Sequence, residues 1–191
     1  MRMQRARGLM ALTAALFLVA TTALPSAAAT TTTYSATFLQ EQTVQRTCPP
    51  GVPAGAFCFT GSDHSGTGTS SPPVPPDIHA TEDFAGFVDF SHPLPNACLP
   101  GPGSPSLTGF PDHNVVTLGT YAGRLFLTTD GTDCMSTGTD DGTWHIIGGT
   151  GIFEGATGSG HVHTQAIGGT GAPNDPIRSM STYSGTITLV H

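Results

Sequence analysis

The chain contains no lysine, and few of its residues carry any charge. In 191 residues there are six basic side chains, all of them arginine, against 13 aspartate and glutamate residues. Arg2, Arg5 and Arg7 account for three of the six, and all 13 acids follow later, so the rest of the chain is strongly acidic. Such a surface repels nucleic acid and anionic lipid, and we expect neither as a partner.

Long apolar runs are also lacking, with one exception near the start. The run Leu9–Ala20 follows the three arginines and precedes the small residues Ser26–Ala29. This order is typical of a secretory signal peptide cleaved after Ala28 or Ala29. We therefore expect a leader over residues 1–29 and a single domain over 30–191. No later run is long enough to span a bilayer, which predicts a soluble, secreted (extracellular) protein without a membrane partner.

Cysteine is scarce, and the CxxC spacing of metal sites does not occur. The four cysteines are Cys48, Cys58, Cys98 and Cys134. An even number in an exported chain predicts two disulfides, for which three connectivities are possible. We favour Cys48–Cys58, which closes a proline-glycine loop, and Cys98–Cys134, which ties a long loop to the end of a predicted strand.

Helical periodicity is absent after the leader, whereas short apolar alternations separated by glycine and proline recur. These patterns predict an all-β fold. In the segment 78–90, Phe84, Val88 and Phe90 share one face. We expect turns at Asp130-Gly131 and over 139–142. The predicted strands cover 30–38 with a continuation over 43–48, then 57–60, 78–90, 115–118, 123–129, 143–147, 159–167 and 180–190.

The predicted strands are arranged around the stretch 142–160, GTWHIIGGTGIFEGATGSG. Alternation places Trp144 and Ile146 on one face of a strand, with His145 and Ile147 on the other. The glycines of GGTG supply a tight turn, after which we expect Ile152-Phe153 to open the return strand. Further glycines in that strand mark the bends that a sheet needs in order to close on itself.

The segment GGTGIFEGATGSG resembles the GGTG-x-F-x-x-A-x-G motif of dirigent proteins and of the allene oxide cyclase barrel. The segments GTITL, at Gly185–Leu189, and RLFLTTDGTDC resemble a closing strand and secreted bacterial relatives of the same group. The resemblance implies a closed antiparallel eight-stranded β-barrel, calycin-like, with an apolar cavity. Plant members form trimers, so a homo-oligomer is implied as well. The matching positions are Gly148, Gly149, Thr150, Gly151, Phe153, Ala156 and Gly158.

Three functions fit such a barrel. The first is the binding of a small apolar or phenolic molecule against Trp144, Phe84, Val88 and Tyr183. The second is a cyclase or stereo-directing enzyme, in which polar groups orient an intermediate. The third is a non-catalytic structural or interaction protein of the cell exterior with a filled core. No cofactor is expected. The candidate acid–base residues are Arg124, Asp89 and Tyr183, with Asp83, Glu154 and Tyr121 as further members of that set.

His161 and His163 are the clearest candidates for metal ligands in the sequence. Residues two apart on a strand face the same side, close enough to share a metal, with His145 or His113 as a third ligand. The frame from Gly155 to His163 matches the start of the cupin metal signature. The glutamate that should follow is missing, however, so we expect a solvent-facing pair rather than a metal site.

Overall fold

The computed structural model describes residues 28–45, 47–63, 81–99, 107–172 and 174–190. The predicted leader lies outside these residues, apart from its last two positions, and so does most of the polar connection after residue 60. Within the described ranges, no helix has the length and apolar character needed to cross a membrane.

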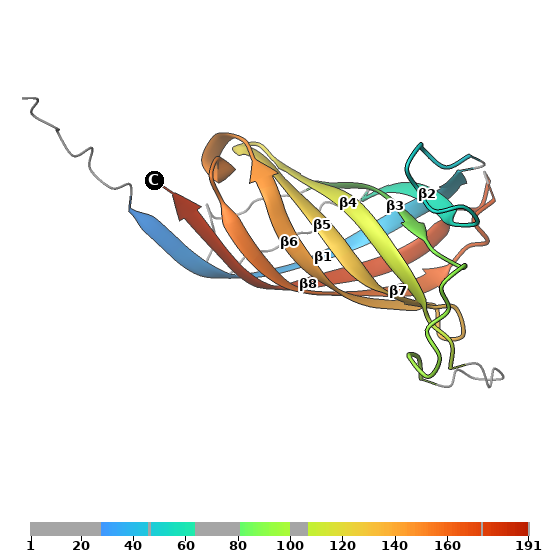
Figure 1. Cartoon of the computed structure of the whole chain (residues 1–191). Coiled ribbons are helices and arrows are strands. Elements are labelled where there is room, and N and C mark those ends of the chain that lie inside the picture. Colours follow the sequence, from blue (N-terminus) through green and yellow to red (C-terminus); the bar gives the residue numbers. More distant parts are fainter. Residues whose placement is uncertain (1–27, 46, 64–80, 100–106, 173, 191) are drawn as a thin grey trace, which may run out of the picture.

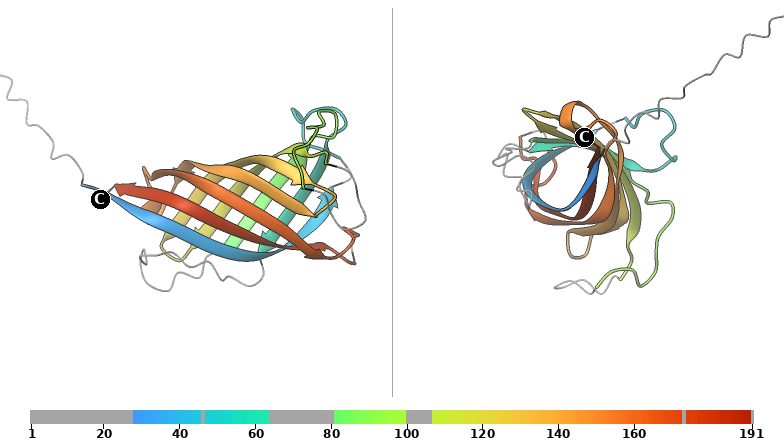
Figure 2. Two further views of the ribbon diagram at one scale, coloured as in Figure 1. Left: turned by 90° about the horizontal axis from the view of Figure 1, so that it is seen from below. Right: turned by 90° about the vertical axis from the view of Figure 1, so that its left-hand side faces the viewer.

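Eight antiparallel strands form a closed barrel in which every strand pairs with its neighbours in the chain (Figure 1). The last strand pairs with the first over the full length of β8, from Ala29 opposite Val190 to Gln42 opposite Ile177, and this pairing closes the ring (Figure 2). The all-β prediction is confirmed. The strands are β1 (Ala29–Gln45), β2 (Phe57–Asp63), β3 (Thr81–Val88), β4 (Phe110–Thr120), β5 (Gly123–Cys134), β6 (Thr139–Gly149), β7 (Thr157–Gly168) and β8 (Ile177–Val190).

The alternation in the sequence selects the face of each strand that turns inward. In β3, Phe84 and Val88 are buried and Asp83 is exposed, and in β8 the buried positions include Tyr183 and Ile187. A strand in a closed barrel has one face inside and one in solvent, so a period of two is the pattern that this fold requires.

Two predicted turns are wrong. Asp130-Gly131 lies inside β5, and residues 139–142 form the start of β6. The chain reverses between them instead, over residues 135–138. Gly131 and Gly142 face each other across the two strands, so the ladder continues through both positions. Here glycine provides space inside a strand rather than a turn, which is its usual meaning in a sheet interior.

The return strand of the central hairpin also begins later than expected. Ile152 and Phe153 belong to a single-turn 3-10 helix, η1 (Gly151–Phe153), and β7 starts at Thr157. Gly151 has a φ of 62°, a value that glycine adopts without strain and that lets the chain leave β6 sharply. Phe153 is buried in the hydrophobic core. We call this end of the barrel, where β1 starts and β8 finishes, the closed end.

Trp144 anchors the packed half of the interior, near the closed end. Its ring lies over Gly160 of β7 and Gly185 of β8. A Cβ on Gly160 would lie 2.7 Å from Trp144 Cε2, and a Cβ on Gly185 would lie 2.6 Å from Trp144 Cζ2. The indole Nε1 donates to Ser184 O at 3.2 Å, and the Tyr34 ring packs edge-on at 5.7 Å. The indole ring of Trp144 fits here because the two residues that face it, Gly160 and Gly185, have no side chains.

The preferred disulfide pairing is confirmed. Cys48 bonds to Cys58 across the β1–β2 loop, with 10 residues between them in sequence. Cys98, in the β3–β4 connection, bonds to Cys134 at the end of β5, with a separation of 36. Both bridges lie at the end of the barrel opposite η1, which we call the open end.

Gly185→Ala should destabilise the protein by about 2–3 kcal/mol, since the added methyl group overpacks a filled site. Its Cβ would meet the backbone oxygen of Ser159 at 2.3 Å and Trp144 Cζ2 at 2.6 Å. Gly148→Ala is the matched control, because its Cβ would meet only Phe126 Cδ2, at an ordinary 3.7 Å. Urea unfolding of both variants measures the difference. Equal losses of unfolding free energy in the two variants would contradict the packing of Trp144 against these glycines.

Candidate functional site

The open half of the barrel interior contains a cavity of about 430 Å³. Every strand contributes to its wall, and Phe90 and Met135 add side chains from the connections at the open end. This volume falls within the range of small-molecule sites in proteins, about 300–1,000 Å³. The cavity is therefore a candidate site for a small molecule.

One wall of the cavity is aromatic. Phe59 of β2 and Phe84 of β3 pack ring against ring at 6.1 Å, with their planes at 67°. Phe57 contacts Phe90 at 6.2 Å, and both rings are partly exposed at the open end. These four side chains, which we call the phenylalanine wall, all line the cavity. They offer an apolar surface to the flat or bulky part of a ligand.

Another wall carries three carboxylic acids, which we call the acid wall: Asp112 of β4, Asp133 of β5 and Asp140 of β6. Asp112 Oδ1 and Asp140 Oδ1 converge over Gly131 of the strand between them. A Cβ on Gly131 would lie 2.7 Å from the first oxygen and 2.6 Å from the second. Asp133 lies directly opposite Asp140 in the β5–β6 register.

Burial favours the protonated form of these acids. It raises the pKa of Asp133 to about 6. Burial likewise raises the pKa values of Asp112 and Asp140, and repulsion from Asp112 and Asp133 moves that of Asp140 furthest. Neither Asp112 Oδ1 nor Asp140 Oδ1 receives a hydrogen bond from any other described residue. One proton held between them supplies the missing donor, so the pair titrates in two steps.

Asn114 supports the acid wall from the next inward position of β4. Its Nδ2 donates to Asp112 Oδ2 at 2.8 Å and to Thr129 Oγ1 at 2.9 Å, which uses both of its donors. The side chain is 8% exposed and lines the cavity, and its Oδ1 has no hydrogen-bond donor among the described residues. The amide therefore fixes Asp112 and leaves a spare acceptor.

A second polar network lies at the inner limit of the cavity. Glu82 is fully buried and accepts hydrogen bonds from Gln40 Nε2 at 2.6 Å and Tyr183 Oη at 2.5 Å. Gln40 Oε1 in turn accepts from Ser179 Oγ at 3.0 Å. Burial, followed by the charge of Glu82, raises the pKa of Tyr183 well above its usual value. Gln40, Ser179 and Tyr183 therefore present polar groups to the cavity from fixed positions.

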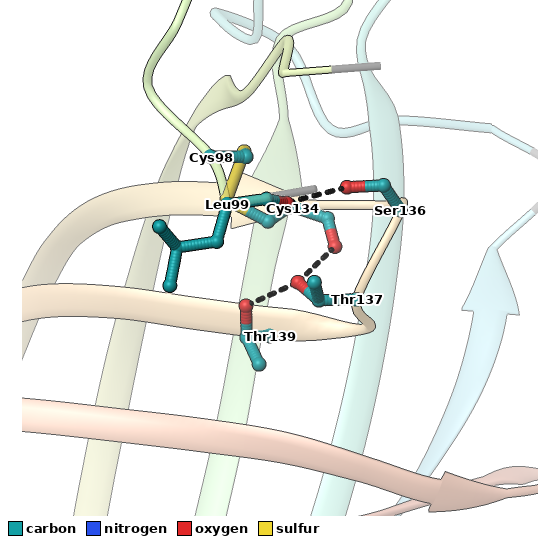
Figure 3. The surroundings of a disulfide bond; sticks show 6 residues. All are labelled: Cys98, Leu99, Cys134, Ser136, Thr137 and Thr139. Carbon is teal, nitrogen blue, oxygen red and sulfur yellow. Dashed lines mark hydrogen bonds between the residues drawn. A yellow bond between two sulfur atoms is a disulfide. The ribbon is translucent and has the colours of Figure 1, made fainter. Parts of the chain in front are cut away.

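The Cys98–Cys134 disulfide lies beside the turn that joins β5 to β6, between two acids of the acid wall (Figure 3). Cys134 directly follows Asp133, and its carbonyl accepts a hydrogen bond from Thr137 Oγ1 at 3.3 Å. Thr137 Oγ1 also lies 2.7 Å from Thr139 Oγ1, next to Asp140. The bridge and these contacts fix the spacing between Asp133 and Asp140.

The structure divides the predicted ligand-binding residues between two regions. Phe84, Val88 and Tyr183 line the cavity. Trp144 points inward as predicted, but it lies in the packed half and is not part of the cavity wall. Its ring fills the space over Gly160 and Gly185, so no room for a ligand is left beside it.

The predicted acid–base residues do not come together. Arg124 is exposed on the outer face of β5, because Leu125 and Leu127 take the inward positions. Asp89 lies just beyond β3 in a turn, where hydrogen bonds from Ser91 and then His92 lower the pKa of its carboxyl. Tyr183 alone of the three faces the cavity. Of the wider set, Asp83, Glu154 and Tyr121 are all exposed.

His161 and His163 share the outer face of β7, as the alternation predicted. The Nδ1 atom of His163 lies 2.6 Å from Asp141 Oδ1, on β6. His113 makes a similar contact with Asp130 at 2.7 Å, elsewhere on the outer surface. The described residues contain no group of three or more histidine, cysteine, aspartate or glutamate side chains arranged to hold a metal ion.

Sequence reasoning missed the acid wall and Glu82. A signal was present: Asp133 continues the inward phase of Leu125, Leu127 and Thr129, and Asp112 shares the phase of Val116. Extending the strands by a few residues in the same alternation would have placed these acids inside. The wrong turn assignment at Asp130-Gly131 ended the strand too early to show it.

Asp140→Asn should stabilise the protein in a pH-dependent way. In the folded state the pKa of Asp140 is raised above its unfolded value, so folding favours the protonated form, and this stability is lost as pH rises above about 4. The variant should therefore exceed the wild type by about 1–3 kcal/mol at pH 8 and by little at pH 4. Urea unfolding at pH 4, 6 and 8 measures this. Asp83→Asn, on the exposed face, is the control, and a gain independent of pH would contradict the assignment.

No family model matches the chain, and no curated protein sequence matches it. Among solved structures, it is similar to the pterocarpan synthase dirigent protein GePTS1, with 13% sequence identity over 83% of this chain and 86% of that chain. The TM-score of that superposition is 0.27. A value this low carries no inference about activity or ligand.

Proposed function

We propose that the protein is an exported barrel that binds a small molecule, with an apolar or phenolic body, in the open half of its interior. The observation that carries this proposal is the cavity of about 430 Å³ at the open end. A barrel whose only role is structural has no need of such a space, because unfilled volume in a core costs stability. The cavity therefore favours a binding function over a purely structural one.

The composition of the wall supports the same ligand class. The phenylalanine wall suits an aromatic or aliphatic body. Gln40, Ser179 and Tyr183 are held by mutual or neighbouring hydrogen bonds and can orient a hydroxyl group. A few fixed polar groups within a mainly apolar wall are typical of small-molecule sites. The acid wall would repel an anion, so anionic ligands are disfavoured.

We further propose that the barrel is related to the dirigent and allene oxide cyclase group and that it acts outside the cell. Support for the kinship comes from the GGTG-x-F motif, which lies at the end of β6 and over η1, and from the closed ring of eight strands. Support for export comes from the predicted leader and the two disulfides, which persist in oxidising compartments.

A second candidate function is catalysis of the cyclase or stereo-directing kind. The observation that favours it is Asp140, whose pKa burial raises so far that the acid keeps its proton at neutral pH. A protonated carboxyl on a cavity wall can donate a proton to a bound intermediate. Turnover of a ligand by the wild type and its loss in Asp140→Asn would support this second function.

The binding proposal predicts that the protein, exported from its own host, carries a small molecule that native mass spectrometry detects. Val162→Phe should abolish binding of this molecule. Val162 is buried on the cavity wall, and the phenyl ring would occupy the space of the ligand. His163→Phe places the same phenyl ring on the outer face of the same strand, outside the cavity, and should leave the bound molecule in place. Unfolding curves establish that both variants are folded.

If Val162→Phe does not fold, Ala166→Phe provides the same test nearer the open end, where Ala166 is exposed yet lines the cavity. A molecule retained by the folded cavity variants would place binding elsewhere. The absence of any bound molecule from all preparations, together with no binding of small aromatic alcohols or amines, would overturn the proposed function.

A further inference from the structure

The cavity is unbalanced in charge. The acid wall contributes Asp112, Asp133 and Asp140, whereas no lysine or arginine occurs among the described residues that line the cavity. Arg124 and Arg178 are both exposed on the outside of the barrel. Buried carboxyl groups without a cationic partner are costly, and the raised pKa values of these three express that cost. A cation inside the cavity would lower the free-energy cost of ionising these carboxyl groups.

The acceptors of the cavity also outnumber its free donors near the acid wall. Asn114 has committed both amide hydrogens, and its Oδ1 is left without a donor. Its side chain is 8% exposed and lines the cavity beside the acids, with Nδ2 bonded to Asp112 Oδ2. Asn114 therefore has no hydrogen to donate to a ligand, and a ligand that brings N–H groups suits this part of the wall better than one that brings acceptors.

The phenylalanine wall determines the other end of the ligand. Phe59 and Phe84 line the same cavity as the acids, and Phe57 and Phe90 flank the opening. Phenyl rings offer an apolar surface to a hydrocarbon body, whereas carboxylates pair with a cationic group. An ammonium also offers only donors, which is what the acid wall lacks.

We infer that the ligand of this cavity is a small amine cation with an aromatic or aliphatic body, whose ammonium lies against Asp133 and the Asp112–Asp140 pair. The inference rests on the proposed function and gives it a substrate class. The apolar body of the ligand then lies along the phenylalanine wall.

Binding of such a cation has a consequence that a neutral ligand does not share. An ammonium beside the Asp112–Asp140 pair favours the ionised form, so the carboxyl pair releases its shared proton to the solvent while the amine keeps its own. The groups that face the pair are Asn114 on β4, Asp133 on β5 and Gly131 between the two acids. Asp130 and Asp141 act on the pair from the outer face. All of the charged groups in this set are acidic, so affinity should rise from pH 5 to pH 8.

The test is calorimetric titration of the disulfide-bonded wild type with three probes of one shape: phenethylamine, 2-phenylethanol and phenylacetate. At pH 7 the amine should bind at least about tenfold more tightly than the alcohol, with phenylacetate weakest. Measurement in buffers of different ionisation enthalpy should reveal proton release for the amine only. Asp140→Asn should lower the affinity for the amine about tenfold and leave that for the alcohol unchanged.

Asp83→Asn, on the exposed face of β3, is the matched control and should alter neither affinity. Asp112→Asn replaces Asp140→Asn if the latter does not fold. Equal affinities for amine and alcohol, in the wild type and in the acid variants, would overturn the amine assignment and leave the proposed function intact. Failure of phenethylamine to bind at millimolar concentration would also overturn it. The proposed function is tested separately, by native mass spectrometry for a small molecule that co-purifies with the protein.

Discussion

The pairing of β1 with β8 is the constraint on which the rest of the structure depends. It extends from Ala29 opposite Val190 to Gln42 opposite Ile177 and leaves the sheet without a free edge. Once the ring is closed, the inward side chains share a volume that is set by the number and tilt of the strands. With eight strands, this volume is wide enough either to be filled by side chains or to hold one small ligand.

In this barrel one half of the interior is filled by side chains and the other half contains a cavity. Near the closed end, Trp144 and Phe153 fill the interior, whereas small and polar residues such as Ser179, Ser181 and Thr164 leave space near the open end. The acids border that space, where their burial opposes folding at neutral pH. A sequence selected for stability alone would place apolar residues there, and this is the reason for proposing the open half as the functional one.

The sequence by itself determined the fold class and the facing of most strands, and it favoured the Cys48–Cys58 bridge. These properties depend on local information. Alternation over a few residues shows that Phe84 and Val88 share a face with each other, and that Trp144 and Ile146 do so as well. The bridge between Cys48 and Cys58 closes a short loop, whose ends stay close whatever the rest of the chain does. The motif around Gly148–Gly151 could be recognised for the same reason.

Only the tertiary structure decided which inward residues pack and which line the cavity, and therefore that Trp144 belongs to the core. It also brought together Asp112, Asp133 and Asp140, which come from three strands. Their proximity depends on the register between β4, β5 and β6, which the turns over 121–122 and 135–138 set. For the same reason Asp130-Gly131, a turn signal when read locally, became the middle of a strand.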